Sequence, residues 1–187
     1  MNLPPPYILG LVVCASELCL TLTRRSKPDA TSRDRRSLGL IWLVNLASIG
    51  LGVLLAFTLP AWALPWGHQT YIVGFCLFVP GLALRWFSII YLGRFFTANV
   101  AIAADHRLID SGPYRLIRHP SYTGALLVVL GFGLCVGNLA SLLVIFVPVL
   151  IVCLWRMRIE EQALIEAFGE RYRLYMQRTK RLVPFVY

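Results

Sequence analysis

Two short polar segments carry most of the side chains that could take part in chemistry. Residues 111–124 read SGPYRLIRHPSYTG and supply an imidazole, guanidinium groups and two phenols. Residues 156–161 read RMRIEE and add two carboxylates. The stretch between them, residues 120–155, contains no charged residue. Ionisable side chains beside a long apolar tract cost free energy unless they bind something, so the function is expected in these two segments.

The composition is that of a membrane protein. Hydrophobic residues make up 58% and charged residues 14% of the 187 residues, whereas a soluble domain carries about 25% charge. The net charge of +9 is concentrated in short segments next to apolar tracts, as in loops that face anionic lipid, which argues against a nucleic-acid partner. The five cysteines lie in apolar segments without CxxC spacing or a nearby His, so no metal site or disulfide is expected.

Five apolar segments approach the length of a transmembrane helix: residues 7–23, 38–59, 71–92, 122–136 and 139–155. As a single helix, residues 120–155 would be about 54 Å long at ~1.5 Å per residue, against a hydrocarbon core of ~30 Å. Gly137 and Asn138 near the middle favour a turn. The sequence therefore predicts an all-α integral membrane protein with about five transmembrane helices, of which the last two form a short hairpin.

The distribution of basic residues predicts the orientation. Lys and Arg number six in the first loop, none in the second, four in the third polar segment, none at the hairpin turn and seven from Arg156 onward. Loops rich in Lys and Arg stay in the cytoplasm. Five spans then place the N-terminus outside the cell and both polar segments on the cytoplasmic side, where the active site is expected.

The tail is predicted to form a cytoplasmic helix with one apolar face. Apolar side chains recur there at three- and four-residue steps: Leu164, Phe168, Tyr172 and then Tyr175 or Met176. Gly169 marks a possible break. Glu160 and Glu161 stand four residues before Leu164 and Ile165, so both carboxylates are expected to point toward protein or membrane rather than open water.

Two further charges lie inside predicted membrane helices. Glu17 and Arg85 each stand six or seven residues from the cytoplasmic end of their segments, about 10 Å below that surface. Our hypothesis is that they form an ion pair or share a polar pocket. The alternative is that Arg85 extends its side chain to the surface while Glu17 is protonated or hydrogen-bonded.

In their order and separation, the two polar segments resemble the signature of the isoprenylcysteine carboxyl methyltransferase family. The first block, G-x-Y-x₃-R-H-P-x-Y-x-G, runs from Gly112 to Gly124. The second, R-x-R-x-E-E, runs from Arg156 to Glu161 and is followed by Leu164, Phe168, Gly169, Tyr172, Tyr175 and Pro184. Residues 92–97 and 106–109 are similar to the flanking segments. The resemblance covers about half of the chain, and the phospholipid N-methyltransferases are related.

The resemblance implies S-adenosylmethionine (SAM) as cofactor. The candidate cofactor-binding residues are Tyr114, His119, Pro120, Tyr122, Glu160 and Glu161. His119 is expected to meet the SAM carboxylate, and the two glutamates to accept hydrogen bonds from the ammonium or the ribose hydroxyls. The phenol rings offer faces for adenine or the sulfonium, and Pro120 shapes the turn.

The resemblance also implies methyl transfer to a lipophilic acceptor that enters from the membrane. A carboxylate acceptor needs a cation that positions it and no general base, which makes Arg156 and Arg158 candidate catalytic residues. An amine acceptor needs a base such as Glu160 or His106. Glu160 is therefore the third candidate catalytic residue. The favoured activity is carboxylate O-methylation of an isoprenylcysteine-like substrate.

We interpret the whole chain as one membrane domain, with three transmembrane helices in residues 1–92 and a SAM-binding catalytic half in residues 93–187. Three alternatives stay open. They are N-methylation of a phospholipid or amine, an NADPH-dependent lipid reductase on a related architecture, and a non-enzymatic small membrane binding or transport protein. Internal repeats, typical of transporters, are not evident in the sequence, and its polar groups gather at one face.

Overall fold

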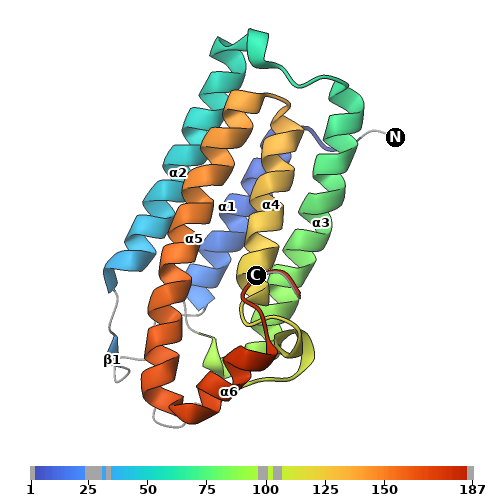
Figure 1. Cartoon of the computed structure of the whole chain (residues 1–187). Helices are drawn as coiled ribbons and strands as arrows, with labels where there is room; N and C mark the ends of the chain where they lie inside the picture. Colours follow the sequence, from blue (N-terminus) through green and yellow to red (C-terminus); the bar gives the residue numbers. More distant parts are fainter. Residues whose placement is uncertain (1–2, 24–30, 33–34, 97–100, 103–106, 185–187) are drawn as a thin grey trace.

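The computed structural model describes residues 3–23, 31–32, 35–96, 101–102 and 107–184. These residues form the helices α1 (Pro6–Thr23), α2 (Arg35–Thr58), α3 (Gly67–Leu92), α4 (Pro120–Val136), α5 (Leu139–Phe168) and α6 (Glu170–Arg178). Two-residue strands, β1 (Thr31–Ser32) and β2 (Ala101–Ile102), pair antiparallel. Figure 1 shows the first five helices running along one another, with α6 lying across one end of the bundle.

The apolar helices form where hydropathy predicts them, but the last is longer than expected. Within the described residues four helices have the length and hydropathy to cross a membrane, and the 17-residue α4 is a shorter apolar helix. The expectation that the fifth helix ends at residue 155 is wrong, because α5 continues to Phe168. Residues 156–168 contain no Gly or Pro. The helix ends only where Gly169 takes a positive φ of 56°. At ~1.5 Å per residue α5 is about 45 Å long, so its last turns project beyond a hydrocarbon core.

Four glycines let α3 and α4 approach closely in antiparallel orientation. A β-carbon built on Gly131 would lie 2.5 Å from the carbonyl oxygen of Gly74, and one on Gly74 would lie 2.6 Å from that of Gly131. Gly81 and Gly124 form the same reciprocal pair, at 2.9 and 2.6 Å. Within each helix the two glycines are seven residues apart, so they lie on one face. Small residues at such contacts are the usual device of membrane helix packing.

The predicted hairpin turn is confirmed at the end of the bundle away from α6. Gly137 adopts the left-handed conformation that ends α4, and Asn138 caps α5 by accepting a hydrogen bond from the Ser141 amide at 3.1 Å. The Asn138 side chain also donates to the Leu59 carbonyl at 2.8 Å. The turn and the second loop therefore meet at one end. The two polar segments lie together at the other end, as the charge count predicts.

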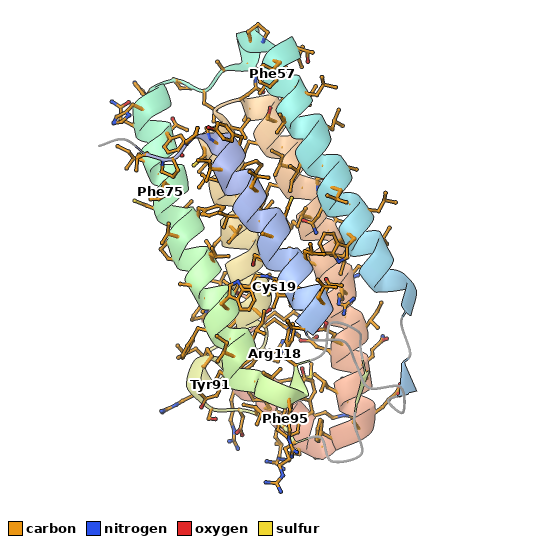
Figure 2. The ribbon with its side chains drawn as sticks, turned by 180° about the vertical axis from the view of Figure 1, so that it is seen from behind. Cys19, Phe57, Phe75, Tyr91, Phe95 and Arg118 are labelled. Atoms are coloured by element: carbon orange, nitrogen blue, oxygen red, sulfur yellow. The ribbon has the colours of Figure 1, made fainter. Side chains whose placement is uncertain are left out.

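The remaining two helices close one side of the bundle. α2 packs along α5, while α1 makes its main contacts with α4. In Figure 2 α1 lies in front of α4, between α3 and α2. Large apolar side chains cover the outer surface of the helices, and Leu11, Leu54, Phe57 and Ile90 are more than half exposed. A surface of this kind suits contact with lipid chains.

Candidate functional site

A cavity of about 240 Å³ joins an apolar region to a charged one. Its apolar part is lined from α1, α2 and α5 by Val13, Leu20, Ile41, Leu46, Ile49 and Val149. Its charged part is lined from the segment before α4 and from α4, α5 and α6 by Tyr114, Arg118, His119, Tyr122, Arg156, Glu160, Tyr172 and Tyr175. An amphipathic ligand with an apolar tail and a polar head matches this division.

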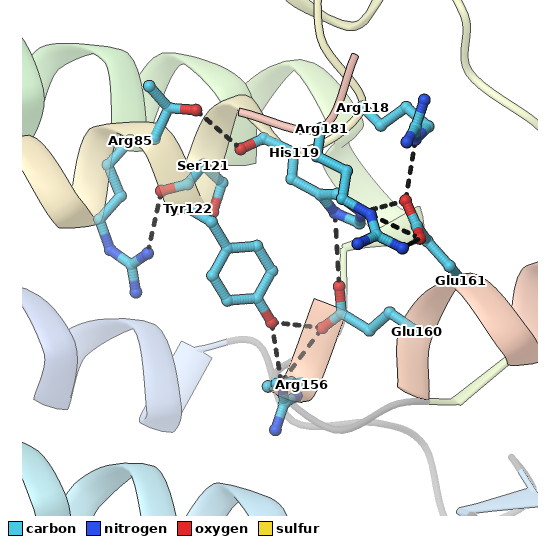
Figure 3. A network of polar contacts seen from close by, with 10 residues as sticks. Arg85, Arg118, His119, Ser121, Tyr122, Arg156, Glu160, Glu161 and Arg181 are labelled. Carbon is cyan, nitrogen blue, oxygen red and sulfur yellow. Dashed lines mark hydrogen bonds and ion pairs between the residues drawn. The ribbon is translucent and has the colours of Figure 1, made fainter. Parts of the chain in front are cut away.

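Tyr122, Arg156 and Glu160 form a compact hydrogen-bonded cluster in the charged part (Figure 3). The Tyr122 phenol donates to Glu160 Oε1 at 2.5 Å. Arg156 Nε donates to the Tyr122 oxygen at 2.9 Å and to the same carboxylate oxygen at 3.1 Å. Arg156 and Glu160 stand four residues apart on α5, so the helix itself brings them together. The cluster places a fixed cation and a fixed anion side by side on the cavity wall.

Glu161 is buried beneath the cavity wall and is held by two arginines. Arg118 Nε lies 2.8 Å from Oε1, and Arg181 donates to Oε2 through Nε at 2.9 Å and Nη2 at 2.6 Å. Arg118 also donates to the main-chain carbonyls of Met176 and Thr179. A carboxylate that is only 3% exposed needs such partners, because an unpaired charge inside a protein is strongly destabilising.

His119 stands between the two glutamates. Its Nε2 lies 3.3 Å from Glu161 Oε1, and its Nδ1 lies 3.8 Å from Glu160 Oε2. An ionised carboxylate only accepts hydrogen bonds, so the proton of a neutral imidazole belongs on Nε2. The Nδ1 lone pair then faces Glu160, and the two atoms together form an acceptor site for a donor group.

Three buried tyrosines support the same region from the side of α6. The Tyr114 phenol donates to the Ser88 carbonyl at 3.2 Å, and the Tyr175 phenol donates to the Tyr114 carbonyl at 2.6 Å. Burial raises the pKa of Tyr114, of Tyr172 and of Tyr175 well above the ordinary phenol value. Their hydroxyls therefore remain neutral donors over the whole physiological pH range.

The structure brings together most of the residues that the sequence singled out. Tyr114, His119, Tyr122, Arg156 and Glu160 line the cavity. Two others lie behind the wall: Glu161 is buried under His119, and the buried Pro120 begins α4. The exposed Arg158 does not line the cavity. His106, the other base considered, lies outside the described residues.

Sequence reasoning missed Arg181 and the α6 tyrosines as part of this arrangement. Arg181 is one of seven basic residues from position 156 onward, and nothing in its local sequence separates it from the others. One signal was present, because adjacent glutamates that point toward the protein interior require cations. Of the four arginines in the two motifs, Arg118 and Arg156 pair with these glutamates. The third cation, Arg181, comes from the segment after α6.

Glu17 and Arg85 form the predicted ion pair. Arg85 Nη2 donates to Glu17 Oε2 at 2.8 Å, and Nη1 donates to the Ser121 carbonyl at 3.3 Å. Beside this pair, Trp86 Nε1 donates to Ser16 Oγ at 2.8 Å. The pair therefore joins α1 to α3 and to the first turn of α4, next to Tyr122.

Removing one member of this pair is expected to destabilise the fold. Glu17→Gln leaves the largely buried Arg85 guanidinium without its counter-ion and should cost about 3 kcal/mol in unfolding free energy. Glu17→Arg combined with Arg85→Glu should recover part of this loss, because the ion pair is restored while the bond to Ser121 is lost. Denaturation in lipid nanodiscs measures both effects. If the charge-swapped protein is no more stable than Glu17→Arg or Arg85→Glu alone, the ion pair does not stabilise the fold.

Comparisons with known proteins agree on one family. A sequence-family profile described as phospholipid methyltransferase matches residues 69–171. The chain is 36% identical over 115 residues to protein-S-isoprenylcysteine O-methyltransferase B of Arabidopsis thaliana, covering 60% of this chain and 58% of that protein. It is 32% identical over 122 residues to the protein-S-isoprenylcysteine O-methyltransferase of Schizosaccharomyces pombe, covering 64% and 50%. The chain thus spans little more than half the length of these curated relatives.

A solved structure has the same fold. The eukaryotic intramembrane Ras methyltransferase, an isoprenylcysteine carboxyl methyltransferase, superposes with a TM-score of 0.73 at 23% sequence identity, covering 99% of this chain and 70% of that one. The predicted all-helical integral membrane fold is therefore confirmed.

Proposed function

Because the chain belongs to the phospholipid methyltransferase family, we propose that it transfers a methyl group from SAM to a lipophilic acceptor at one face of the membrane. The acceptor that the relatives' names favour is the carboxylate of an isoprenylcysteine-like group. The observation that carries the proposal is the cavity, which connects an apolar region between α1 and α2 with the Tyr122–Arg156–Glu160 cluster.

The donors and acceptors of the charged part fit SAM. We assign the pair of acceptors formed by Glu160 Oε2 and His119 Nδ1 to the ammonium group of its amino acid part. From the sequence we expected His119 to meet the SAM carboxylate, but in the structure its Nε2 lies against Glu161 instead. The cavity-lining phenols of Tyr114, Tyr172 and Tyr175 offer aromatic surface for the adenine or the sulfonium. When bound, SAM supplies an electrophilic methyl group on a positively charged sulfur.

The protein side chains then have to hold the acceptor in line with that methyl group and keep water away. Arg156 is the cation that suits a carboxylate acceptor, since Tyr122 and Glu160 fix its guanidinium in the cavity wall. Arg158 is less suited because its side chain lies outside the cavity. The apolar tail of the acceptor is accommodated between α1 and α2. A carboxylate acceptor requires no proton transfer, so Glu160 acts in this reaction as a binding and positioning group.

The basic residues support an orientation with the site in the cytoplasm and the N-terminus outside. Arg118, Arg156 and Arg181 belong to the two polar segments and the tail, which lie together at the α6 end of the bundle. Positive charge gathers on the cytoplasmic side of membrane proteins. Within the single membrane domain, residues 93–187 carry the cofactor site and residues 1–92 complete the wall that faces lipid.

SAM binding tests the proposal most directly. We expect SAM to raise the melting temperature of the protein in nanodiscs, and NADPH to leave it unchanged. Labelled SAM should transfer its methyl group to a prenylated cysteine with a free carboxylate and not to the same compound carrying a carboxamide. Methylation of phosphatidylethanolamine instead would establish N-methylation. An intact protein that binds no SAM in nanodiscs would overturn the proposal.

A further inference from the structure

The segment after α6 runs beside the segment that carries His119. The Arg118 amide donates to the Lys180 carbonyl at 2.8 Å, and the His119 amide donates to the Arg181 carbonyl at 3.0 Å. Thr123 Oγ1 donates to the Leu182 carbonyl at 2.8 Å. These bonds hold residues 180–182 in register with the start of α4. The main chain at Arg181 is thereby fixed next to the imidazole.

The side chain of Arg181 reaches Glu161 from this fixed position. Its Nε and Nη2 both donate to Oε2, at 2.9 and 2.6 Å, while Arg118 and His119 share Oε1. The two oxygens of the carboxylate thus have separate partners (Figure 3). A planar guanidinium that binds through two nitrogens fixes the orientation of a carboxylate as well as its charge.

We propose that Arg181 is a positioning residue for the methyl-transfer site and acts on His119 through Glu161. By occupying Oε2, it turns Oε1 toward the imidazole and keeps Glu161 ionised as an acceptor. The ring is then held with its proton on Nε2 and its Nδ1 lone pair toward Glu160. This inference rests on the proposed function for its consequence, which is the binding of the SAM ammonium group, but the tautomer of His119 is a property of the protein alone.

Loss of Arg181 changes the partners of His119 in a definite way. Glu161 then keeps one arginine for two carboxylate oxygens and is free to turn. The imidazole loses its fixed acceptor, so the ring samples the other tautomer. In that tautomer Nδ1 carries the proton and no longer accepts a hydrogen bond. A positively charged group near Glu160 is then bound less well.

The variant Arg181→Met, with Arg181→Lys and Lys180→Met beside it, tests this role. Lysine keeps the charge but not the two-nitrogen contact. Lys180 is the exposed neighbour, and its main-chain carbonyl, which accepts from the Arg118 amide, is kept in Lys180→Met. ¹⁵N-histidine labelling gives three imidazoles, from His68, His106 and His119, and His119→Gln identifies the signal of interest. The dissociation constant of SAM is measured on the same nanodisc samples.

We expect the wild-type protein and Lys180→Met to show a single His119 tautomer with a protonated Nε2. Arg181→Met should show a protonated Nδ1 and bind SAM about tenfold more weakly, as expected for one lost hydrogen bond to a charged group. Arg181→Lys should lie between them. If Arg181→Met does not fold, Arg181→Lys decides the question.

An unchanged tautomer and unchanged SAM affinity in the folded Arg181 variants would overturn the positioning role and leave the proposed function intact. The opposite failure is also recognisable. If the wild-type protein shows the Nε2 tautomer, loses it in Arg181→Met and yet binds no SAM, the contact is confirmed and the proposed function is wrong.

Discussion

Replacing Glu160 by Gln is expected to lower kcat/KM for methyl transfer by at least a factor of about 100, which corresponds to about 2.7 kcal/mol. The carboxylate accepts hydrogen bonds from Tyr122 and Arg156 and faces His119. An amide of the same shape removes the charge and presents donors where the site needs acceptors. In the proposed function, the SAM ammonium group then loses its anionic partner, and Arg156 loses a group that orients it.

Radiolabelled methyl transfer and SAM titration in nanodiscs measure this effect. Glu166→Gln is the matched control, because it makes the same chemical change at an exposed position on the same helix, outside the cavity lining. Its kinetics should equal those of the wild-type protein. Glu160→Gln is expected to fold, since Glu160 is partly exposed and its neighbours remain hydrogen-bonded. A folded variant with normal SAM affinity and turnover would refute the assignment of the site.

The second large effect concerns the fold. Gly131→Leu is expected to lower stability by more than about 3 kcal/mol, because overpacking alone costs 1–3 kcal/mol where a few atoms are added. A β-carbon at this position would already lie 2.5 Å from the Gly74 carbonyl and 2.7 Å from the Phe78 amide nitrogen. Both are main-chain atoms of α3, so the clash is relieved only if α3 and α4 move apart.

Gly50→Leu provides the control for the helix propensity and hydrophobicity of the new side chain. Gly50 lies on α2, is exposed, and would place a β-carbon within 4 Å of nothing else. We expect this variant to be as stable as the wild-type protein. Thermal unfolding in detergent compares the two. Equal melting temperatures for Gly131→Leu and the wild-type protein would show that the helices are not held at the distance seen here.

Hydropathy and turn residues predicted most of the fold, because they act locally. The five apolar segments, the turn at Gly137 and the break at Gly169 follow from residue types within a few positions of each feature. The continuation of α5 from the apolar tract to Gly169 as one unbroken helix could not be read in this way. Hydropathy indicates where the apolar tract ends, whereas a helix ends where the backbone leaves the helical conformation. The polar residues after Trp155 keep that conformation, so α5 continues without interruption.

The sequence predicted those residues of the site that belong to the two motifs. His119, Tyr122, Arg156 and Glu160 were all expected, and the structure places them on one cavity. Their individual partners were not predictable, since Glu161 and Glu160 are adjacent in sequence but face different groups. The contact of Arg181 with Glu161 depends on the path of residues 179–182 beside α4, which is a tertiary feature. Arg158 was chosen with Arg156 by motif alone, and the helix directs its side chain elsewhere.

The glycine pairs between α3 and α4 also determine which parts of the protein can shift when a lipid tail enters. Since the glycines recur every seven residues on both helices, a slide of one turn would set a larger side chain against main-chain atoms, and the next matching position is about 10 Å away. The two helices therefore cannot slide along each other, and they hold His119 and Tyr122 at a fixed position. α1 is held differently: Gly10 faces the Phe132 side chain of α4 rather than main-chain atoms, and the side chains of Ser16, Glu17 and Thr21 bond to α2 and α3. Side chains rearrange more easily than main-chain atoms in contact, so we expect the α1 side of the cavity to adapt more readily than the α3–α4 side.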